Sequence, residues 1–354
     1  MRILIIAGGT GGHVYPAFTI AKKFCDHGHD IAWIGKENSL EEKLAVKEGF
    51  NFSSINAKGF LGKNFLGKLV SIFLLGTSLI KGYVLILKLK PDLVFSTGGY
   101  LSLGPSLSAF FYCPLFIHEQ NSVPGLTNKI LHRISKNTFE AFPNTFKTHR
   151  KKVFTVGNPI RAEIAELPNT KELIDSRFRV LVIGGSQGSQ QINDIMIKAL
   201  RGKDISSKWF FTHQVGKLES KELRKAYDET GASFVIKDFI DDMSEVYRNS
   251  DIVISRSGAM SVSEICSAQK PSILLPLPWS ADNHQAYNAK FLSERGAAIV
   301  LKSNISSAQA LYQLLIELEK DHNRREAMKR AAGMVFPKST SDTIYNKIHE
   351  SLQL

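Results

Sequence analysis

The chain has 354 residues, of which 43% are hydrophobic, and a formal net charge of +12. This length supports two packed cores of ordinary size, and the composition is too polar on average for a bundle of membrane helices. The three cysteines, Cys25, Cys113 and Cys266, show neither a disulfide nor a zinc-site spacing, which favours a reducing compartment. A positive field attracts phosphates, nucleic acids and anionic lipids alike, but no zinc-finger, RNP-type or basic-zipper pattern favours nucleic acid.

The first predicted elements are a strand, a glycine loop and a helix. Ile3 to Ala7 is an apolar run that leads directly into the loop GGTGGH, so it is interpreted as a buried strand and not as a secretion signal. Apolar residues then recur at helical spacing up to Cys25, and Gly28 ends the helix. Later apolar runs that follow helical segments predict a parallel sheet with crossovers. These runs occupy 31–34, 93–96 and 115–118.

The same arrangement occurs a second time. Val180 to Ile183 is a predicted strand, Gly184 to Gly188 a glycine loop and Ile192 to Leu200 an amphipathic helix. Further strands are predicted at 209–212, 234–237, 252–255, 272–276 and 298–301. Gly157, Asn158 and Pro159 supply a linker. We therefore expect one Rossmann-like domain at 1–157, a second at 158–337, and a last helix within 338–354 that can pack back on the first.

Both glycine loops deliver main-chain N–H groups to a helix start, where an anion is favoured, although a tight turn needed only for packing is the alternative. The third glycine of a dinucleotide fingerprint would fall at Val14, which disfavours an oxidoreductase. The loop GGSQGS at 184–189 suits a diphosphate leaving group without a metal ion. The sequence has no DxD metal motif, and the adjoining Asp241 and Asp242 are best interpreted as a helix cap.

Three further polar clusters follow predicted strands. HEQN at 118–121 suits acid–base chemistry or sugar binding, and equally a hydrogen-bonded strand end. In RSGAMSVSE at 256–264, Glu264 lies about two turns into a helix, where a carboxylate can pair with ribose hydroxyls; alone, it is more often a surface residue. The polar loop 276–289 follows another strand, an arrangement typical of a ligand crevice.

The segment Lys58 to Lys90 interleaves apolar residues with lysines. This pattern indicates a helix lying in a membrane interface, or a core helix with a lysine-rich outer face. A membrane-spanning helix is disfavoured, because Lys81 and the glycines interrupt the apolar run before the roughly 20 residues that spanning requires.

Eight motifs, taken in order over nearly the whole chain, resemble the MurG family of bacterial peptidoglycan N-acetylglucosaminyltransferases. They are GGTGGHVYPA (8–17), GGY (98–100), HEQN (118–121), GNPIR (157–161), GGSQGS (184–189), FIDDM (239–243), RSGAMSVSE (256–264) and DNHQAYNA (282–289). The resemblance implies an α/β protein of the GT-B fold, with two Rossmann-like, doubly wound parallel-sheet domains facing across a cleft. The N-terminal domain would bind a lipid-diphosphate acceptor and the membrane, and the C-terminal domain UDP-N-acetylglucosamine.

The family's site residues carry over position by position. The residues implied to contact the donor are Thr10, Gly11, Gly12, Asn121, Arg161, Ser186, Ile240, Ala259, Met260, Ser261, Val262, Ser263, Glu264 and Gln285. Among them, Glu264 would hold the ribose, Ile240 would meet the uracil through its backbone, and Ser186 would hold the diphosphate. His13 is the first candidate for the catalytic base and Glu119 the second, and Tyr100 lies on the acceptor side. Two departures from the family pattern are Ser189 in place of alanine and a different proline spacing after Tyr100.

The implied activity is an inverting transfer of N-acetylglucosamine from UDP-N-acetylglucosamine to the 4-hydroxyl of N-acetylmuramic acid in undecaprenyl-pyrophosphoryl-MurNAc-pentapeptide. This step converts lipid I to lipid II in peptidoglycan synthesis, a process on which cell shape and cell division depend. No cofactor and no metal ion would be needed for donor binding. The expected location is the cytoplasmic face of the bacterial inner membrane, bound peripherally to its anionic surface, with other cell-wall synthesis or division proteins as candidate partners.

Two other hypotheses remain open at this stage. A different lipid glycosyltransferase of the same fold, such as a diacylglycerol glycosyltransferase, is disfavoured by the intact HEQN and GNPIR motifs. A nucleotide-sugar-binding or membrane-tethering protein without enzymatic activity would keep the glycine loops but lack His13 and Glu119.

Overall fold

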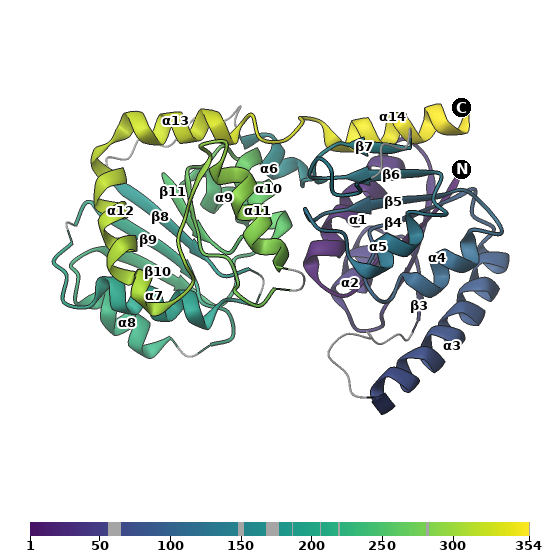
Figure 1. Cartoon of the computed structure of the whole chain (residues 1–354), viewed down its shortest axis with the longest axis horizontal. Coiled ribbons are helices and arrows are strands. Elements are labelled where there is room, and N and C mark those ends of the chain that lie inside the picture. Colours follow the sequence, from purple (N-terminus) through teal and green to yellow (C-terminus); the bar gives the residue numbers. More distant parts are fainter. Residues whose placement is uncertain are drawn as a thin grey trace. The chain divides into compact units, whose positions relative to one another are not determined.

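The computed structural model describes residues 1–55, 65–147, 152–167, 177–185, 187–205, 207–218, 220–280 and 283–353, without the side chains of 65–73. The chain divides into two compact units (Figure 1). Unit 1 comprises Met1–Ile160 with Pro337–Leu354, and unit 2 comprises Arg161–Phe336. The division therefore falls at 160/161, close to the linker, and the C-terminal segment belongs to unit 1.

In the described part of unit 1, seven parallel strands lie in the order β3-β2-β1-β4-β5-β6-β7. They are β1 (Arg2–Ile6), β2 (Asp30–Gly35), β3 (Asn51–Ser54), β4 (Leu93–Ser96), β5 (Leu115–Glu119), β6 (Asn137–Glu140) and β7 (Val153–Thr155). Ile3 pairs with Ile31 on one side and with Leu93 on the other, so β1 is central. The strand order reverses between β1 and β4, where open α/β sheets bind ligands beyond the carboxyl ends of their strands.

Helices cover both faces of this sheet, because alternate strand residues point to opposite sides. Ile3 and Ile5 pack with α1 (Gly11–Asp26), α2 (Leu40–Lys47) and α14 (Thr340–Leu352). Leu4 and Ile6 pack with α3 (Phe65–Leu89), α4 (Leu103–Ala109) and α5 (Leu126–Leu131). The residues 56–64 of the predicted interfacial segment lie outside the described ranges. Within those ranges, none of the helices combines the length and apolarity that crossing a bilayer requires.

In the described part of unit 2, six parallel strands repeat the same order, β10-β9-β8-β11-β12-β13. They are β8 (Phe178–Ile183), β9 (Trp209–Gln214), β10 (Ser233–Lys237), β11 (Ile252–Ser255), β12 (Ser272–Leu274) and β13 (Ala298–Val300). The reversal between β8 and β11 corresponds to the one between β1 and β4. Both units are thus Rossmann-like, as the doubled strand and glycine-loop pattern predicts.

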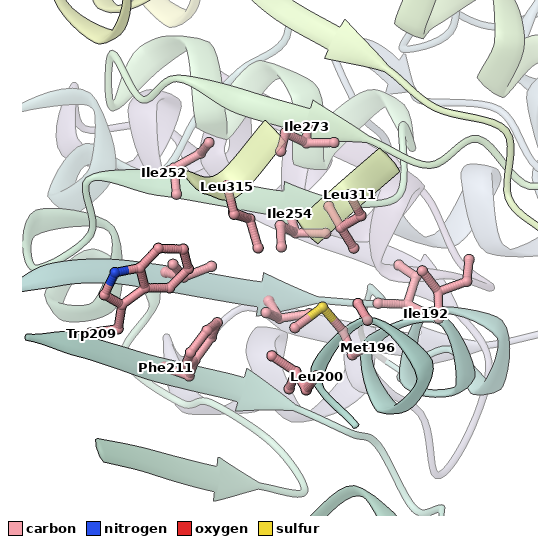
Figure 2. Packing of buried hydrophobic residues seen from close by; sticks show 14 of the residues in the cluster. Ile192, Met196, Leu200, Trp209, Phe211, Ile252, Ile254, Ile273, Leu311 and Leu315 are labelled. Carbon is pink, nitrogen blue, oxygen red and sulfur yellow. The ribbon is translucent and has the colours of Figure 1, made fainter. Parts of the chain in front are cut away.

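One hydrophobic cluster of unit 2 packs on one face of its sheet (Figure 2). Phe211 and Ile254 of the strands pack in this cluster with Met196 of α7 (Gln190–Leu200) and Leu315 of α12 (Ala308–Lys320), and all four are 0% exposed. The helices of unit 2 are α6 (Ala162–Ala165), α7 (Gln190–Leu200), α8 (Lys221–Asp228), α9 (Met243–Arg248), α10 (Ala259–Ser267), α11 (His284–Ser293), α12 (Ala308–Lys320) and α13 (His322–Ala332), with a short 3-10 turn at Ile305–Ser307. This packing fixes the strand ends from which the second set of site residues extends.

Candidate active site

The first glycine loop connects β1 to α1 at the strand-order reversal of unit 1. Gly9 has a φ of +109°, a conformation that favours glycine, and Thr10 is the N-cap of α1 without a side-chain cap bond. Gly11 and Gly12 form the first turn of the helix, where N–H groups lack partners within the helix. Three of the predicted donor contacts therefore lie at a helix N-terminus, which favours an anion.

His13 lies one residue further into this helix and is anchored to the neighbouring strands. Its Nδ1 is 2.9 Å from the Thr97 carbonyl oxygen and 2.9 Å from Gln120 Oε1. The Thr97 hydroxyl in turn donates to the His13 carbonyl at 2.9 Å. Both neighbours of Nδ1 are acceptors, so Nδ1 carries the proton and the lone pair of neutral His13 is on Nε2. A histidine in this tautomer is able to accept a proton at Nε2.

Glu119, the other base candidate, is 1% exposed, and both of its carboxyl oxygens accept hydrogen bonds within unit 1. Its Oε1 accepts from the N–H and the side-chain amide of Asn121 at 3.0 and 3.2 Å. Its Oε2 accepts from the Gly125 N–H and the Asn128 amide at 3.1 and 2.9 Å. These four donors tie the Glu119 carboxyl group to the loop after β5. This geometry is that of a hydrogen-bonded strand end, which the HEQN motif equally suits.

Tyr100 lies in the turn that follows β4 and is 40% exposed. Gly98 and Gly99 precede it with φ of +83° and +88°, and a Cβ at Gly98 would lie 2.8 Å from the Asn128 amide. A Cβ on Gly9 would be 3.7 Å from the Tyr100 ring, so this ring lies next to the first glycine loop. Tyr100, His13 and Thr10 therefore share the carboxyl end of the unit 1 sheet.

In unit 2, the second glycine loop follows β8 and leads into α7. Ser186 lies outside the described residues. Ser189 is the N-cap of α7, and its hydroxyl accepts from the Ile192 N–H at 3.4 Å. The serine that departs from the family's alanine thus has a local role at the helix start. Asp242 likewise caps α9 by accepting from the Glu245 N–H at 3.0 Å, which confirms the interpretation of Asp241 and Asp242 as a helix start.

Arg256 is a buried cation beside this loop. Its Nε and Nη2 donate to the Ser189 hydroxyl at 3.1 and 2.7 Å. Nη2 also donates to Gln191 Oε1 at 2.5 Å, and Nη1 donates to the Leu275 carbonyl at 2.9 Å. It also contacts the Ser303 hydroxyl. All of these acceptors are neutral oxygens, and burial lowers the pKa of Arg256 to about 10, so it stays charged at neutral pH. The start of α7 therefore lies next to a positive charge.

Glu264 lies on α10, which begins at Ala259 after the Gly258 N-cap. Its Oε1 accepts from Arg161 at 3.0 Å, and the two side chains are only 11% and 18% exposed. Burial raises the pKa of Glu264, and the Arg161 cation opposes that shift. Tyr247 is fully buried, and burial together with the Glu264 charge raises its pKa well above the ordinary value. Glu264 is thus a fixed, buried carboxylate and not a surface helix residue.

The remaining residues predicted to contact the sugar donor differ in how far their side chains are exposed. Met260 and Ser261 are partly exposed on the first turn of α10, whereas Val262 and Ser263 are 0% and 3% exposed. A direct contact through Val262 would have to use its backbone. Ile240 is 2% exposed, and its N–H donates to Gln214 Oε1 at 3.3 Å, which leaves the carbonyl as its other backbone group.

Gln214 and Gln285 tie the loops of unit 2 together. Gln214 also donates to the Gly185 carbonyl at 2.8 Å, so it links the second glycine loop to Ile240. Gln285 Oε1 accepts from the Leu277 N–H at 3.0 Å, and its carbonyl accepts from the Ser257 hydroxyl at 2.8 Å. The loops at the strand ends of unit 2 are thus interconnected, while Ala259 to Glu264 lie on α10 and Gln285 on α11.

Some of the predicted residues lie close together within a unit: His13 and Tyr100 adjoin the loops after β1 and β4 in unit 1, and Arg161 pairs with Glu264 in unit 2. The structure also shows contacts made by residues to which the motifs assigned no role. Thr97, Gln120, Arg256 and Gln214 make the contacts described above, and none was assigned a role from the sequence. Gln120 and Arg256 lie inside the motifs HEQN and RSGAMSVSE, and this was the sequence signal that could have identified them. Among the described residues, no group of three or more His, Cys, Asp or Glu side chains is arranged to hold a metal ion.

Comparisons with known proteins agree over most of the chain. The glycosyltransferase family 28 N-terminal domain matches residues 3–140, and the family 28 C-terminal domain matches residues 179–344. A protein of Coxiella burnetii (strain RSA 493 / Nine Mile phase I), named UDP-N-acetylglucosamine--N-acetylmuramyl-(pentapeptide) pyrophosphoryl-undecaprenol N-acetylglucosamine transferase, is 38% identical over 94% of this chain and 93% of its own length. A protein of the same name from Shewanella frigidimarina is 40% identical over 89% of this chain and 87% of its own.

Solved structures show the same architecture. The crystal structure of MurG from Acinetobacter baumannii matches with a TM-score of 0.80 and 28% identity over 99% of both chains. The calicheamicin glycosyltransferase CalG4 matches with a TM-score of 0.71 at 15% identity over 100% of this chain and 98% of its own, which is a likeness of fold alone.

Proposed function

Since this chain belongs to glycosyltransferase family 28 and, within it, to the MurG family of undecaprenol N-acetylglucosamine transferases, we infer that it transfers N-acetylglucosamine from UDP-N-acetylglucosamine to lipid I. The product is lipid II, the disaccharide precursor of peptidoglycan. The observation that carries this conclusion is the 36–40% identity to enzymes of that name over about nine-tenths of the chain.

The reaction is a direct displacement. The 4-hydroxyl oxygen of N-acetylmuramic acid bonds to the anomeric carbon of the donor sugar, and the bond from that carbon to the β-phosphate oxygen breaks. UDP leaves with the bonding electron pair, the hydroxyl proton passes to the base, and the inverted configuration gives a β bond. The chain has to supply a proton acceptor and a stabilising environment for the departing diphosphate.

We propose His13 as the base, ahead of Glu119. The tautomer of His13 supports this assignment, because its Nε2 carries the lone pair while Nδ1 is anchored. The carboxylate oxygens of Glu119 are occupied by donors from its own loop. We propose that Tyr100, which lies next to the first glycine loop, is on the acceptor side of the site.

We propose that unit 2 binds the donor without a cation. Glu264, held by Arg161, would accept hydrogen bonds from the ribose hydroxyls. The N–H groups at the start of α7, together with the Arg256 charge, would stabilise the departing diphosphate. Transfer should therefore persist in EDTA. A loss of turnover that Mg²⁺ restores would refute this part of the proposal.

We further propose that unit 1 binds an anionic membrane surface peripherally, at the cytoplasmic face of the inner membrane. The apolar α3 face consists of Ile80, Tyr83, Val84 and Leu87, which are 44–69% exposed at helical spacing. The exposed lysines Lys81 and Lys88 lie on the same helix. Exposed apolar residues next to cations suit a bilayer interface with anionic headgroups. The segment after α4 adds the exposed aromatic residues Phe110, Phe111 and Tyr112.

Vesicle co-sedimentation tests this surface. Vesicles with anionic lipids should retain the wild-type protein, and Ile80→Glu with Val84→Glu should release most of it. Val46→Glu is the matched control, because Val46 is 64% exposed on α2, which covers the opposite face of the unit 1 sheet. Equal retention of the two variants would refute the assignment of the α3 face.

The decisive experiment for the activity supplies labelled UDP-N-acetylglucosamine together with a short-chain lipid I analogue or with diacylglycerol. We expect the disaccharide product only with the muramoyl acceptor. Transfer to diacylglycerol would favour the alternative lipid glycosyltransferase, and donor binding without transfer would favour a binding protein. His13→Ala should lower kcat by about 100-fold or more with little change in donor KM, since general base catalysis contributes on that order.

A further inference from the structure

Three hydrogen bonds inside unit 1 form a continuous chain that ends at His13. His118 Nε2 is 2.9 Å from the Gly157 carbonyl oxygen. His118 Nδ1 is 3.1 Å from Gln120 Nε2. Gln120 Oε1 is 2.9 Å from His13 Nδ1. His118 and Gln120 are 0% and 1% exposed, so solvent does not compete for these bonds.

The Gly157 carbonyl at one end determines which partner is the donor in every hydrogen bond of this chain. A carbonyl only accepts, so His118 Nε2 donates to Gly157 and its Nδ1 accepts. Gln120 must then direct its NH₂ group to His118, where it also donates to the His118 carbonyl at 3.0 Å. The amide oxygen of Gln120 consequently faces His13, and His13 Nδ1 has to be the donor. Burial lowers the pKa of His118 to about 4, so this residue remains neutral.

We propose that Gln120 and His118 are positioning residues that, together with the Thr97 carbonyl, hold His13 as the Nδ1–H tautomer and so make Nε2 its proton-accepting atom. The inference rests on the proposed function, in which His13 is the base. In a free histidine side chain the Nε2–H tautomer is the commoner one, and that tautomer has no lone pair at Nε2.

The other titratable groups around His13 do not provide this function. His118 is neutral, because burial lowers its pKa to about 4. Glu119, at the end of β5, is bonded to Asn121, Gly125 and Asn128. Tyr100 follows β4 and lies next to Gly9. Glu41 of α2 lies next to Gly8, and its Oε1 accepts a hydrogen bond from the Lys36 N–H. Among the described hydrogen bonds, Nδ1 of His13 contacts only neutral acceptors, Thr97 and Gln120.

Two near-isosteric substitutions should move the pKa of His13 in opposite directions. Gln120→Met removes an acceptor from Nδ1 and should lower this pKa, whereas Gln120→Glu places a carboxylate there and should raise it by about one pH unit or more. Gln353→Glu adds the same charge at an exposed position of unit 1 and should leave the pKa of His13 unchanged. A residue that merely packs the strand end would not produce opposite shifts.

The measurement is an NMR titration of ¹⁵N-histidine-labelled protein without substrate, with His13 assigned by its loss in His13→Gln. Wild-type His13 should show the Nδ1–H tautomer, and the acidic limb of the kcat profile should follow the titrated pKa in each variant. A predominantly Nε2–H tautomer in the wild type, or a His13 pKa that moves in neither variant, would overturn the inference. If Gln120→Met does not fold, Gln120→Glu decides alone. Failure of the proposed function would appear separately, as absence of transfer by a wild-type protein with the expected tautomer.

Discussion

Replacing Gly188 with alanine should be far more destabilising than the same replacement at another glycine of unit 2. Gly188 has a φ of +74°, and an added Cβ would lie 2.1 Å from the Val215 carbonyl oxygen and 2.5 Å from its carbon. Gly216 lies opposite, where a Cβ would be 2.1 Å from the Gln187 oxygen. The second glycine loop and the end of β9 therefore cross at a distance that only two glycines permit.

The magnitude follows from two contributions. A left-handed backbone costs a residue with a side chain about 1–2 kcal/mol. Displacing neighbouring backbone atoms adds about 1–3 kcal/mol or more, so the total for Gly188→Ala is about 2–5 kcal/mol. Gly202 is the matched control, because its φ is +68° and a Cβ there would meet nothing within 4 Å. Gly202→Ala should therefore cost only about 1–2 kcal/mol.

Differential scanning calorimetry of the full chain measures both variants. For a unit of this size, each kcal/mol lowers the Tm by about 2–4 °C. We expect the unit 2 transition to fall much further for Gly188→Ala, with weaker UDP binding because the start of α7 shifts. Equal Tm values for the two alanine variants would refute the argument that the loops cross within contact distance.

Three further predictions concern charge, acid stability and the C-terminal helix. Arg256→Met should weaken binding of UDP more than binding of uridine in isothermal titration calorimetry, because the lost charge acts on the phosphates; equal weakening would assign Arg256 a purely structural role. Buried His118 and His213 have pKa values of about 4 and 3, below the ordinary 6.5, so each contributes stability that is present above pH 6.5 and is lost as the pH falls towards 4. In urea titrations, the free energy of unfolding should fall by about 1.4 kcal/mol per pH unit for each of these histidines in this window. His213→Gln should flatten this pH dependence for unit 2 only. Ile348→Ala should destabilise unit 1 by about 2–5 kcal/mol and leave the unit 2 transition unmoved, since Ile348 is 0% exposed in the unit 1 core.

The sequence predicted strands where an apolar run coincides with a buried strand. The ranges Leu93–Ser96 and Ile252–Ser255 match β4 and β11 residue for residue. The strands that it did not predict are short: β3 (NFSS) and β6 (NTFE) are polar, and β7 (VFT) has only three residues. Their pairing with a neighbouring strand, and not their own pattern, makes them strands. Local periodicity cannot reveal such elements.

For the candidate site, the motifs indicated which residues matter but not how they are bonded. His13 was the first candidate for the base and Glu119 the second, and the motifs did not show the hydrogen bonds of either side chain. His13 meets Thr97 and Gln120 across 84 and 107 residues, distances over which spacing carries no information. The charge of Arg256 was visible in its motif, whereas its neutral partners Ser189 and Leu275 come from other loops. The motifs therefore supplied the candidate residues, and the roles proposed for them rest on tertiary hydrogen bonds that the motifs do not show.

The return of the chain to unit 1 at Pro337 has a consequence for biosynthesis. Ile344 and Ile348 complete the unit 1 core, and the Thr340 hydroxyl donates to the Val156 carbonyl at 2.6 Å. During translation, unit 1 is thus the first to leave the ribosome, but it lacks α14 until all of unit 2 has been synthesised. Unit 2 is encoded without interruption, so the unit 1 core stays incomplete, with the apolar residues that α14 covers still exposed, while unit 2 is made.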